Sequence, residues 1–217
     1  MRFAVLGTGV VGPTIATRLV ALGHEVMMGS RDATNERAAA WVAQTGSGAS
    51  AGTFADAAAF GEMVVNATAG LHSLDALAAC GAGLLAGKII VDVSNPLDFS
   101  AGFPPRLTNC GDDSTGEQIQ RAFPDARVVK TLNTINCDVM VNPHLAPGGN
   151  VFVSGEDPGA KREVRQLLQS FGWPDADIVD IGDIKSSRGA EAYVLFWVRL
   201  MQAEGTARFN ISIVRGR

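Results

Sequence analysis

The fold is decided close to the N-terminus by the stretch Val5-Leu6-Gly7-Thr8-Gly9-Val10-Val11-Gly12. It ends a short apolar run, and apolar residues recur beyond it at the helical positions 11, 15, 19 and 22. Strand, glycine-rich turn and helix in this order form a dinucleotide site. Gly7 allows the tight turn, Gly9 lets the pyrophosphate approach the backbone, and Gly12 lets the helix pack closely. We therefore predict a pyrophosphate at the helix N-terminus.

Length and composition are typical of one compact enzyme domain. The 217 residues suit an α/β, doubly wound (Rossmann) parallel sheet over 1–182, with a small helical portion over 183–217. The net charge of −4 disfavours nucleic acid or an anionic membrane as a partner. Cys80, Cys110 and Cys137 are odd in number and lack metal-ligand spacing. Without a leader or a membrane-length apolar run, we expect a soluble, cytoplasmic protein.

The residues at the end of the second predicted strand indicate whether the site binds NADP or NAD. NAD sites usually place an acidic residue about 20 residues beyond the glycines, whereas NADP sites carry groups that accept the 2′-phosphate. At this position the sequence has Ser30 and then Arg31, and the guanidinium of Arg31 can bind a phosphate bidentately. Asp32 follows and could hold a ribose or cap the next helix. We predict NADP, with Asp32 as the helix N-cap.

Three later strands, predicted over 63–66, 88–93 and 126–132, end in small or amide-bearing residues. Because parallel strands present their carboxyl ends to one crevice, we expect these residues to line the cofactor site. Pro96 also biases Asn95 away from helix and directs its backbone into the crevice. The three groups are Ala67, Thr68 and Ala69; Ser94, Asn95 and Pro96; and Asn133, Thr134 and Ile135.

Periodicity places the remaining elements. Helices are expected over 33–44, 56–60, 74–85, 115–123, 158–170 and 187–204, with loops over 46–52 and 99–105. Strands over 150–154 and 177–181, with the helix between them, should extend the same sheet. The last helix is apolar on more than one face, which predicts cover by a partner subunit or a ligand.

Acid–base side chains are scarce in this sequence. His72 and His144 are isolated, and no lysine follows the single tyrosine, Tyr193, at the spacing of a Tyr-x-x-x-Lys pair. We therefore predict no catalytic side chain and no metal site. A carbonyl reductase needs a positioned proton donor, whereas a flavin-type ring needs mainly orientation and proximity.

Several segments resemble the NADP oxidoreductases that depend on coenzyme F420. The resemblance rests on residues 7–12, on 23–26 before Gly29-Ser30-Arg31, on 129–135, and on 187–191 through 210–211. It implies a homodimer that transfers hydride between NADPH and a deazaflavin. Assigned residue by residue, it places Thr8, Ser30 and Arg31 on NADP, and Asn133, Thr134, Ile135 and Met201 beside the deazaflavin.

The chain departs from the family pattern at two places. Asn35 stands where the family has a lysine near the 2′-phosphate, and Arg37 could replace that lysine. Asn133-Thr134-Ile135-Asn136 replaces a His-Thr-Ile-Pro run. The acceptor therefore stays open among F420, FMN, FAD and a small carbonyl or imine. A non-enzymatic NADP-binding sensor is a third hypothesis, which predicts a crevice filled by the protein's own side chains.

Overall fold

The computed structural model describes residues 1–109 and 111–216, and it contains one large mixed sheet. The strand order is β10-β9-β8-β5-β4-β1-β2-β3, in which β3-β2-β1-β4-β5-β8 has the Rossmann order. The strands are β1 Arg2–Leu6, β2 Glu25–Ser30, β3 Ala49–Thr53, β4 Met63–Asn66, β5 Ile89–Asp92, β8 Arg127–Thr131, β9 Val151–Ser154 and β10 Ile178–Asp180. The predicted α/β doubly wound class is confirmed.

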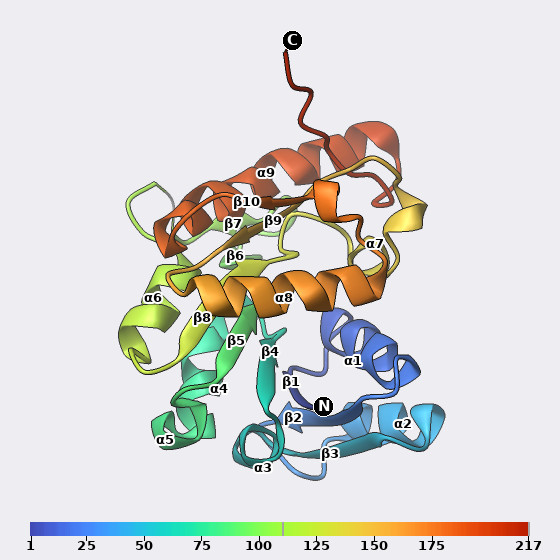
Figure 1. The fold of residues 1–217 in the computed structure, drawn as a ribbon, viewed down its shortest axis with the longest axis vertical. Coiled ribbons are helices and arrows are strands. Elements are labelled where there is room, and N and C mark those ends of the chain that lie inside the picture. The colour runs from blue at the N-terminus through green and yellow to red at the C-terminus, as the bar shows by residue number, and fades with distance from the viewer. Residues whose placement is uncertain (110, 217) are drawn as a thin grey trace.

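Helices cover both faces of this sheet (Figure 1). They are α1 Val11–Ala21, α2 Glu36–Thr45, α3 Phe54–Phe60, α4 Ser73–Cys80, α5 Ala82–Leu85, α6 Thr115–Ala122, α7 Cys137–Val141, α8 Pro158–Phe171 and α9 Ser187–Glu204. Alternating strand residues serve the two faces: Phe3 and Val5 pack under α1, α2, α7 and α8, and Ala4 and Leu6 under α3, α4 and α6. Because these strands are buried on both faces, their sequences are continuous runs of apolar residues.

The predicted βαβ extension does join the sheet, but not as a purely parallel one. β9 pairs antiparallel with β8, and β10 then pairs parallel with β9. A two-stranded hairpin, β6 Leu97–Asp98 and β7 Arg106–Leu107, flanks the predicted loop over 99–105. α9 packs against α6 and β7, at the end of the molecule opposite β3 and α3 (Figure 1).

Several predicted boundaries are wrong, for local reasons. The loop predicted over 46–52 contains most of β3, because its small residues pair with β2 through the backbone. The helix predicted over 33–44 begins at Glu36, since the Asn35 side chain accepts the N–H of Ala38 and caps it. Asp32 is therefore not the cap. The helix predicted over 74–85 is interrupted at Gly81, whose φ is +87°.

Within residues 1–109 and 111–216, no helix combines the length and apolar character needed to cross a bilayer. The same residues contain no cluster of His, Cys, Asp or Glu able to hold a metal ion. The division into 1–182 and 183–217 stays a prediction. After α9, residues 206–216 form no helix or strand, and the Ile211 carbonyl accepts the N–H of Asn150.

Candidate functional site

The glycine-rich turn between β1 and α1 has the form a phosphate site requires. Gly7 has φ +112°, and a Cβ there would lie 2.6 Å from the carbonyl oxygen of Ala67. At Gly12 a Cβ would collide with the Gly7 carbonyl, so close packing of turn and helix needs both glycines. A Cβ on Gly9 would meet no protein atom within 4 Å, which leaves open space over the turn. Such open space is what the predicted approach of a pyrophosphate to the backbone requires.

The N-terminus of α1 faces the same space without a side-chain cap. Its N-cap residue is Val10, which offers no hydrogen-bonding side chain to the first N–H groups. Pro13, in the first turn, lacks an N–H altogether, as expected for a first-turn proline. The remaining free N–H groups and the helix dipole favour an anion here.

Ser30 ends β2 and Arg31 follows it, on the far side of β1 from β4. Ser30 is buried, and its hydroxyl donates to the Asp32 carbonyl at 2.5 Å. The Arg31 side chain is exposed and makes no hydrogen bond or ion pair within the described part of the chain. Arg31 is thus free to contact a phosphate, whereas the Ser30 hydroxyl is already used as a donor.

Asp32 belongs to a turn rather than to a helix cap. Its Oδ1 accepts the backbone N–H of Thr34 at 2.9 Å and the Thr34 hydroxyl at 2.8 Å. These hydrogen bonds hold the pKa of Asp32 below its ordinary value, so the carboxylate stays charged. With its Oδ1 engaged by Thr34, Asp32 is less available to a ribose hydroxyl.

A cavity of about 460 Å³ lies beside the glycine-rich turn, at the carboxyl edge of the sheet. Nine of the predicted residues line it: Val10, Val11, Ala67, Thr68, Ala69, Ser94, Asn95, Asn133 and Ile135. The fold therefore brings the ends of β4, β5 and β8 together as expected. A larger hollow of about 770 Å³ lies between α1, α2 and α8, but none of the predicted site residues lines it.

The other predicted residues lie outside the cavity lining. Gly7, Thr8 and Gly9 form the turn and Gly12 lies in the first turn of α1, whereas Ser30 ends β2 and Arg31 and Asn35 follow it. Pro96 and Thr134 are buried behind the lining. Met201 lies on α9, but the cavity is lined by Val194 and Trp197 of that helix. The contacts predicted for these residues stay predictions.

Sequence reasoning missed half of the cavity wall. The missed residues are Val93, Leu97, Phe99, Cys137, Met140, Val194 and Trp197, together with Asn136, which was named only as part of its loop. Most are apolar residues in helices or loops, which no motif distinguishes from core. The apolar excess of the last helix was the available signal for Val194 and Trp197.

The lining carries almost no acid–base chemistry. None of the described residues that line the cavity is a histidine, tyrosine, lysine, arginine, aspartate or glutamate. Its polar side chains are hydroxyls, amides and the Trp197 indole, whose buried Nε1 has no hydrogen-bond partner among the described residues, and Cys137 adds a half-buried thiol. Asn133 already donates from Nδ2 to Asn95 Oδ1 at 3.0 Å and to the Ala190 carbonyl at 3.1 Å. The wall can orient a ring but offers little to protonate it.

Leu132 holds this amide pair in place from the end of β8. Among the non-glycine residues that the structure describes, only Leu132 has a positive φ, at 63°. Its side chain is buried, and this packing holds the backbone in the unfavourable left-handed conformation. The turn directs Asn133 toward Asn95, whose Nδ2 donates to the Asn133 carbonyl at 2.8 Å. A residue with a strained backbone therefore lies next to Asn133 of the cavity wall.

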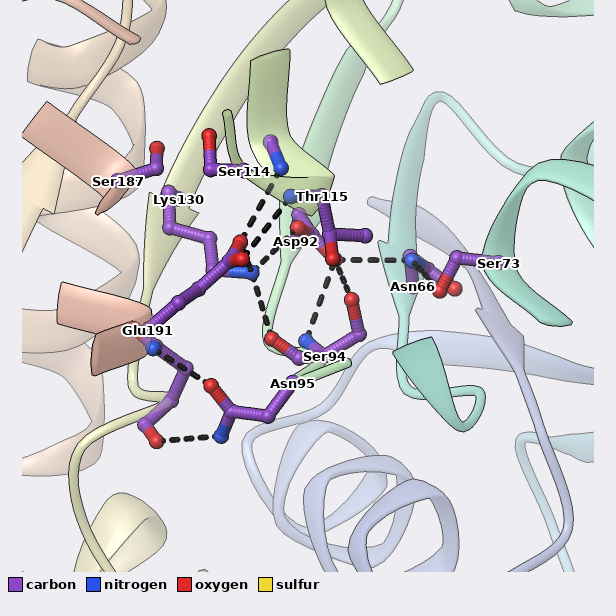
Figure 2. Close-up of polar contacts among 12 residues, drawn as sticks. Asn66, Ser73, Asp92, Ser94, Asn95, Ser114, Thr115, Lys130, Ser187 and Glu191 are labelled. Carbon is purple, nitrogen blue, oxygen red and sulfur yellow. Dashed lines mark hydrogen bonds and ion pairs between the residues drawn. The ribbon is translucent and has the colours of Figure 1, made fainter. Parts of the chain in front are cut away.

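Behind the wall lies a buried charged cluster that the sequence did not reveal (Figure 2). Lys130 Nζ lies 2.8 Å from Asp92 Oδ2 and 2.7 Å from Glu191 Oε1. Asp92 and Lys130 are register partners on β5 and β8, and Glu191 comes from α9. Two charged residues at facing positions of apolar strands were a signal that could have found the pair.

Lys130 is a charged ammonium despite its burial. Burial by itself lowers the pKa of a lysine, but the carboxylates of Asp92 and Glu191 outweigh it and raise the pKa above its ordinary value. The ammonium also donates to the Ser94 carbonyl. The Lys130 ammonium thus joins two carboxylates and one backbone carbonyl.

Comparisons with known proteins identify the family. Residues 2–96 match the family model for NADP oxidoreductases dependent on coenzyme F420. A solved structure of a candidate F420-dependent NADP reductase from Arthrobacter sp. FB24 is 51% identical, with a TM-score of 0.94, and the match covers 99% of this chain and 100% of that one.

Two curated relatives are more distant. The F420-dependent NADP reductase of Methanothermobacter marburgensis is 31% identical over 200 residues, which covers 88% of each chain. Metalloreductase STEAP3 of Rattus norvegicus is 29% identical over 197 residues. That match covers 89% of this chain but only 36% of STEAP3, so this chain spans about a third of that protein. Taken with the predicted motifs, the comparisons show that this chain belongs to the F420-dependent NADP oxidoreductases.

Proposed function

We propose that this protein transfers hydride between NADPH and the ring of a deazaflavin such as coenzyme F420. Its family membership already makes it an NADP-dependent oxidoreductase. The identity of the second reactant is the new part of the proposal. The observation that carries it is the open cavity beside the glycine-rich turn, lined by apolar, hydroxyl and amide groups.

The residues present fit NADP. The open space over Gly9 and the uncapped N-terminus of α1 would take the pyrophosphate. Arg31, exposed and unpaired among the described residues, would take the 2′-phosphate, with Thr8 and Ser30 nearby. The bound nicotinamide supplies the hydride. The protein's task is to orient the ring and to keep the acceptor against it.

The cavity wall supports a flavin-type acceptor over a carbonyl or imine. Reduction of a small carbonyl calls for a proton donor within hydrogen-bond reach of the substrate oxygen. Among the described residues that line it, the Cys137 thiol is the one ionisable donor; the Trp197 indole N–H can donate a hydrogen bond but does not ionise, and the Nδ2 of Asn133 is already bonded. A ring that accepts hydride can be reduced by proximity and orientation alone. The cavity is also open, which argues against a non-enzymatic sensor.

An anaerobic spectral assay tests the proposal. The protein and NADPH are mixed in turn with F420, FMN and FAD, and the visible absorption of each acceptor is followed. We expect F420 to be bleached at a rate proportional to the protein concentration, and FMN and FAD to react more slowly. Reduction of FMN or FAD but not of F420 would show that the acceptor is a flavin and not a deazaflavin. Reduction of none of the three would refute the proposal.

We also propose that α9 forms part of a homodimer interface. Leu195 and Phe196 are 39% and 59% exposed on this helix, next to the residues that line the cavity. A second copy would bury that apolar surface. Sedimentation at micromolar concentration should give a dimer, and Phe196→Ser should shift it toward monomer. A wild-type monomer would contradict this part of the proposal.

A further inference from the structure

The buried cluster of Asp92, Lys130 and Glu191 joins β5, β8 and α9, three elements next to segments that line the cavity (Figure 2). All three side chains are at most 2% exposed, and none of them lines the cavity. Backbone, amide and hydroxyl groups also donate to the two carboxylates, and these donors connect the cluster to the residues around it.

Asp92 and Lys130 hold the loops on the NADP side. Asp92 Oδ1 accepts the Ser94 hydroxyl at 2.7 Å and the Asn66 amide at 2.8 Å. Asn66 in turn accepts the Thr68 hydroxyl at 2.7 Å, and Lys130 donates to the Ser94 carbonyl. Thr68 and Ser94 both line the cavity. One carboxylate thus fixes the loops that follow β4 and β5.

Glu191 holds the opposite wall, helix α9. Besides its ion pair with Lys130, its carboxylate accepts the N–H groups of Thr115 at 2.9 Å and Gly116 at 3.2 Å. Those two donors are the first residues of α6, where a negative charge is favoured. Val194 and Trp197 of the cavity wall lie three and six residues further along α9. The position of that wall therefore depends on Glu191.

Stability alone does not explain ions at this position. Well-packed apolar residues often stabilise a core as much as a buried ion triad does, whereas a triad also fixes distances and directions. From this geometry we infer that Asp92, Lys130 and Glu191 are positioning residues, which set the spacing between the NADP-side loops and the acceptor wall on α9. The inference rests on the proposed hydride transfer.

The test compares carboxamide variants of the two carboxylates. Asp92→Asn should weaken NADPH binding by at least about fivefold, because the carboxamide puts an NH2 donor in place of one of the two oxygens that accept from Lys130 on one side and from Ser94 and Asn66 on the other. Glu191→Gln should leave the NADPH Kd within about twofold. It should weaken F420 binding at least about fivefold and lower kcat at least about tenfold. NADPH and F420 binding are measured by their own fluorescence.

A matched control separates positioning from general loosening of α9. Glu117 of α6 also pairs with α9, through two hydrogen bonds from Arg188 at 2.8 and 2.6 Å, but within the described part of the chain it makes no hydrogen bond or ion pair with Asp92, Lys130 or Glu191. Glu117→Gln should leave both Kd values and kcat unchanged. The primary deuterium isotope effect on kcat should rise in Glu191→Gln alone, because a misplaced acceptor makes hydride transfer slower relative to product release.

The outcomes distinguish the two proposals. A wild type that binds F420 without reducing it refutes the proposed function, and the split between the two Kd values still decides the positioning role. The positioning role is refuted if Glu191→Gln behaves like Glu117→Gln, or if it weakens NADPH and F420 equally. Should Glu191→Gln fail to fold, Glu191→Asp retracts the same carboxylate by one methylene and is read by the same criteria.

Discussion

The glycine-rich turn and the buried cluster of Asp92, Lys130 and Glu191 differ in how the sequence encodes them. The turn is built by consecutive residues, so its glycines can be recognised without the fold. The cluster is held by residues far apart: Lys130 reaches Asp92 across 38 positions, and Glu191 reaches Thr115 across 76. A site assembled from local geometry is readable from spacing, whereas one assembled from long-range pairs is visible only after folding.

The largest expected effect is a loss of unfolding free energy when the buried cluster is broken, and Lys130→Met tests it. The change leaves the carboxylates of Asp92 and Glu191 buried without their cation, and breaking a buried pair in this way costs about 3–5 kcal/mol. Urea unfolding measures the loss. Lys161→Met is the control, because its partner Asp180 is 47% exposed and stays solvated. Equal losses in the two variants would contradict a special role for the buried cluster.

In the glycine-rich turn, a substitution should change the affinity for NADPH without changing the stability of the fold. Gly9→Val fills the open space over the turn and should weaken NADPH binding roughly 10- to 100-fold, the value of one or more charge-assisted hydrogen bonds. Its melting temperature should stay unchanged, because a Cβ there meets no protein atom within 4 Å. Gly7→Val, at φ +112°, should lose both binding and stability. Unchanged NADPH affinity in Gly9→Val would place the pyrophosphate elsewhere.

The 2′-phosphate contact should give a smaller effect. Arg31→Ala should weaken NADPH at least about tenfold and leave NADH nearly unchanged, because only NADPH carries the phosphate. Titration of both nucleotides into wild type and variant measures this selectivity. Arg37→Ala serves as the comparison and should have the lesser effect. Equal affinities of the wild type for NADPH and NADH would reassign Asp32 as a ribose ligand.

The smallest effect concerns acid stability at the α6–α9 contact. Hydrogen bonds from Arg188 hold the pKa of Glu117 below its ordinary value of 4.5. A lowered pKa contributes stability above pH 4.5 that is lost as the pH falls through the folded-state value. Glu117→Gln should therefore lower stability near pH 7, by no more than about 1 kcal/mol because Arg188 is partly exposed. Thermal melts between pH 3 and 7 should converge for the two proteins at the acid end.

The sequence was enough to predict the sheet, the glycine turn and three of the loops that meet at the cavity. It failed where small residues could form either loop or strand, as in β3, since pairing with β2 decides that choice. It also failed on the cap of α2, because Asp32 and Asn35 are both good caps and only the backbone shows which one is used. The buried ions escaped because no local pattern links Asp92 to Glu191.

Direct transfer of hydride between the two rings is the central claim, and isotope labelling tests it most directly. NADPH deuterated on one face of the nicotinamide C4 is mixed anaerobically with the protein and F420, and the reduced deazaflavin is analysed by mass spectrometry and NMR. We predict that deuterium from one face only appears on the ring carbon of the reduced acceptor. Reduced acceptor that carries solvent hydrogen instead, or equal transfer from both faces, would contradict a cavity that holds the two rings against each other.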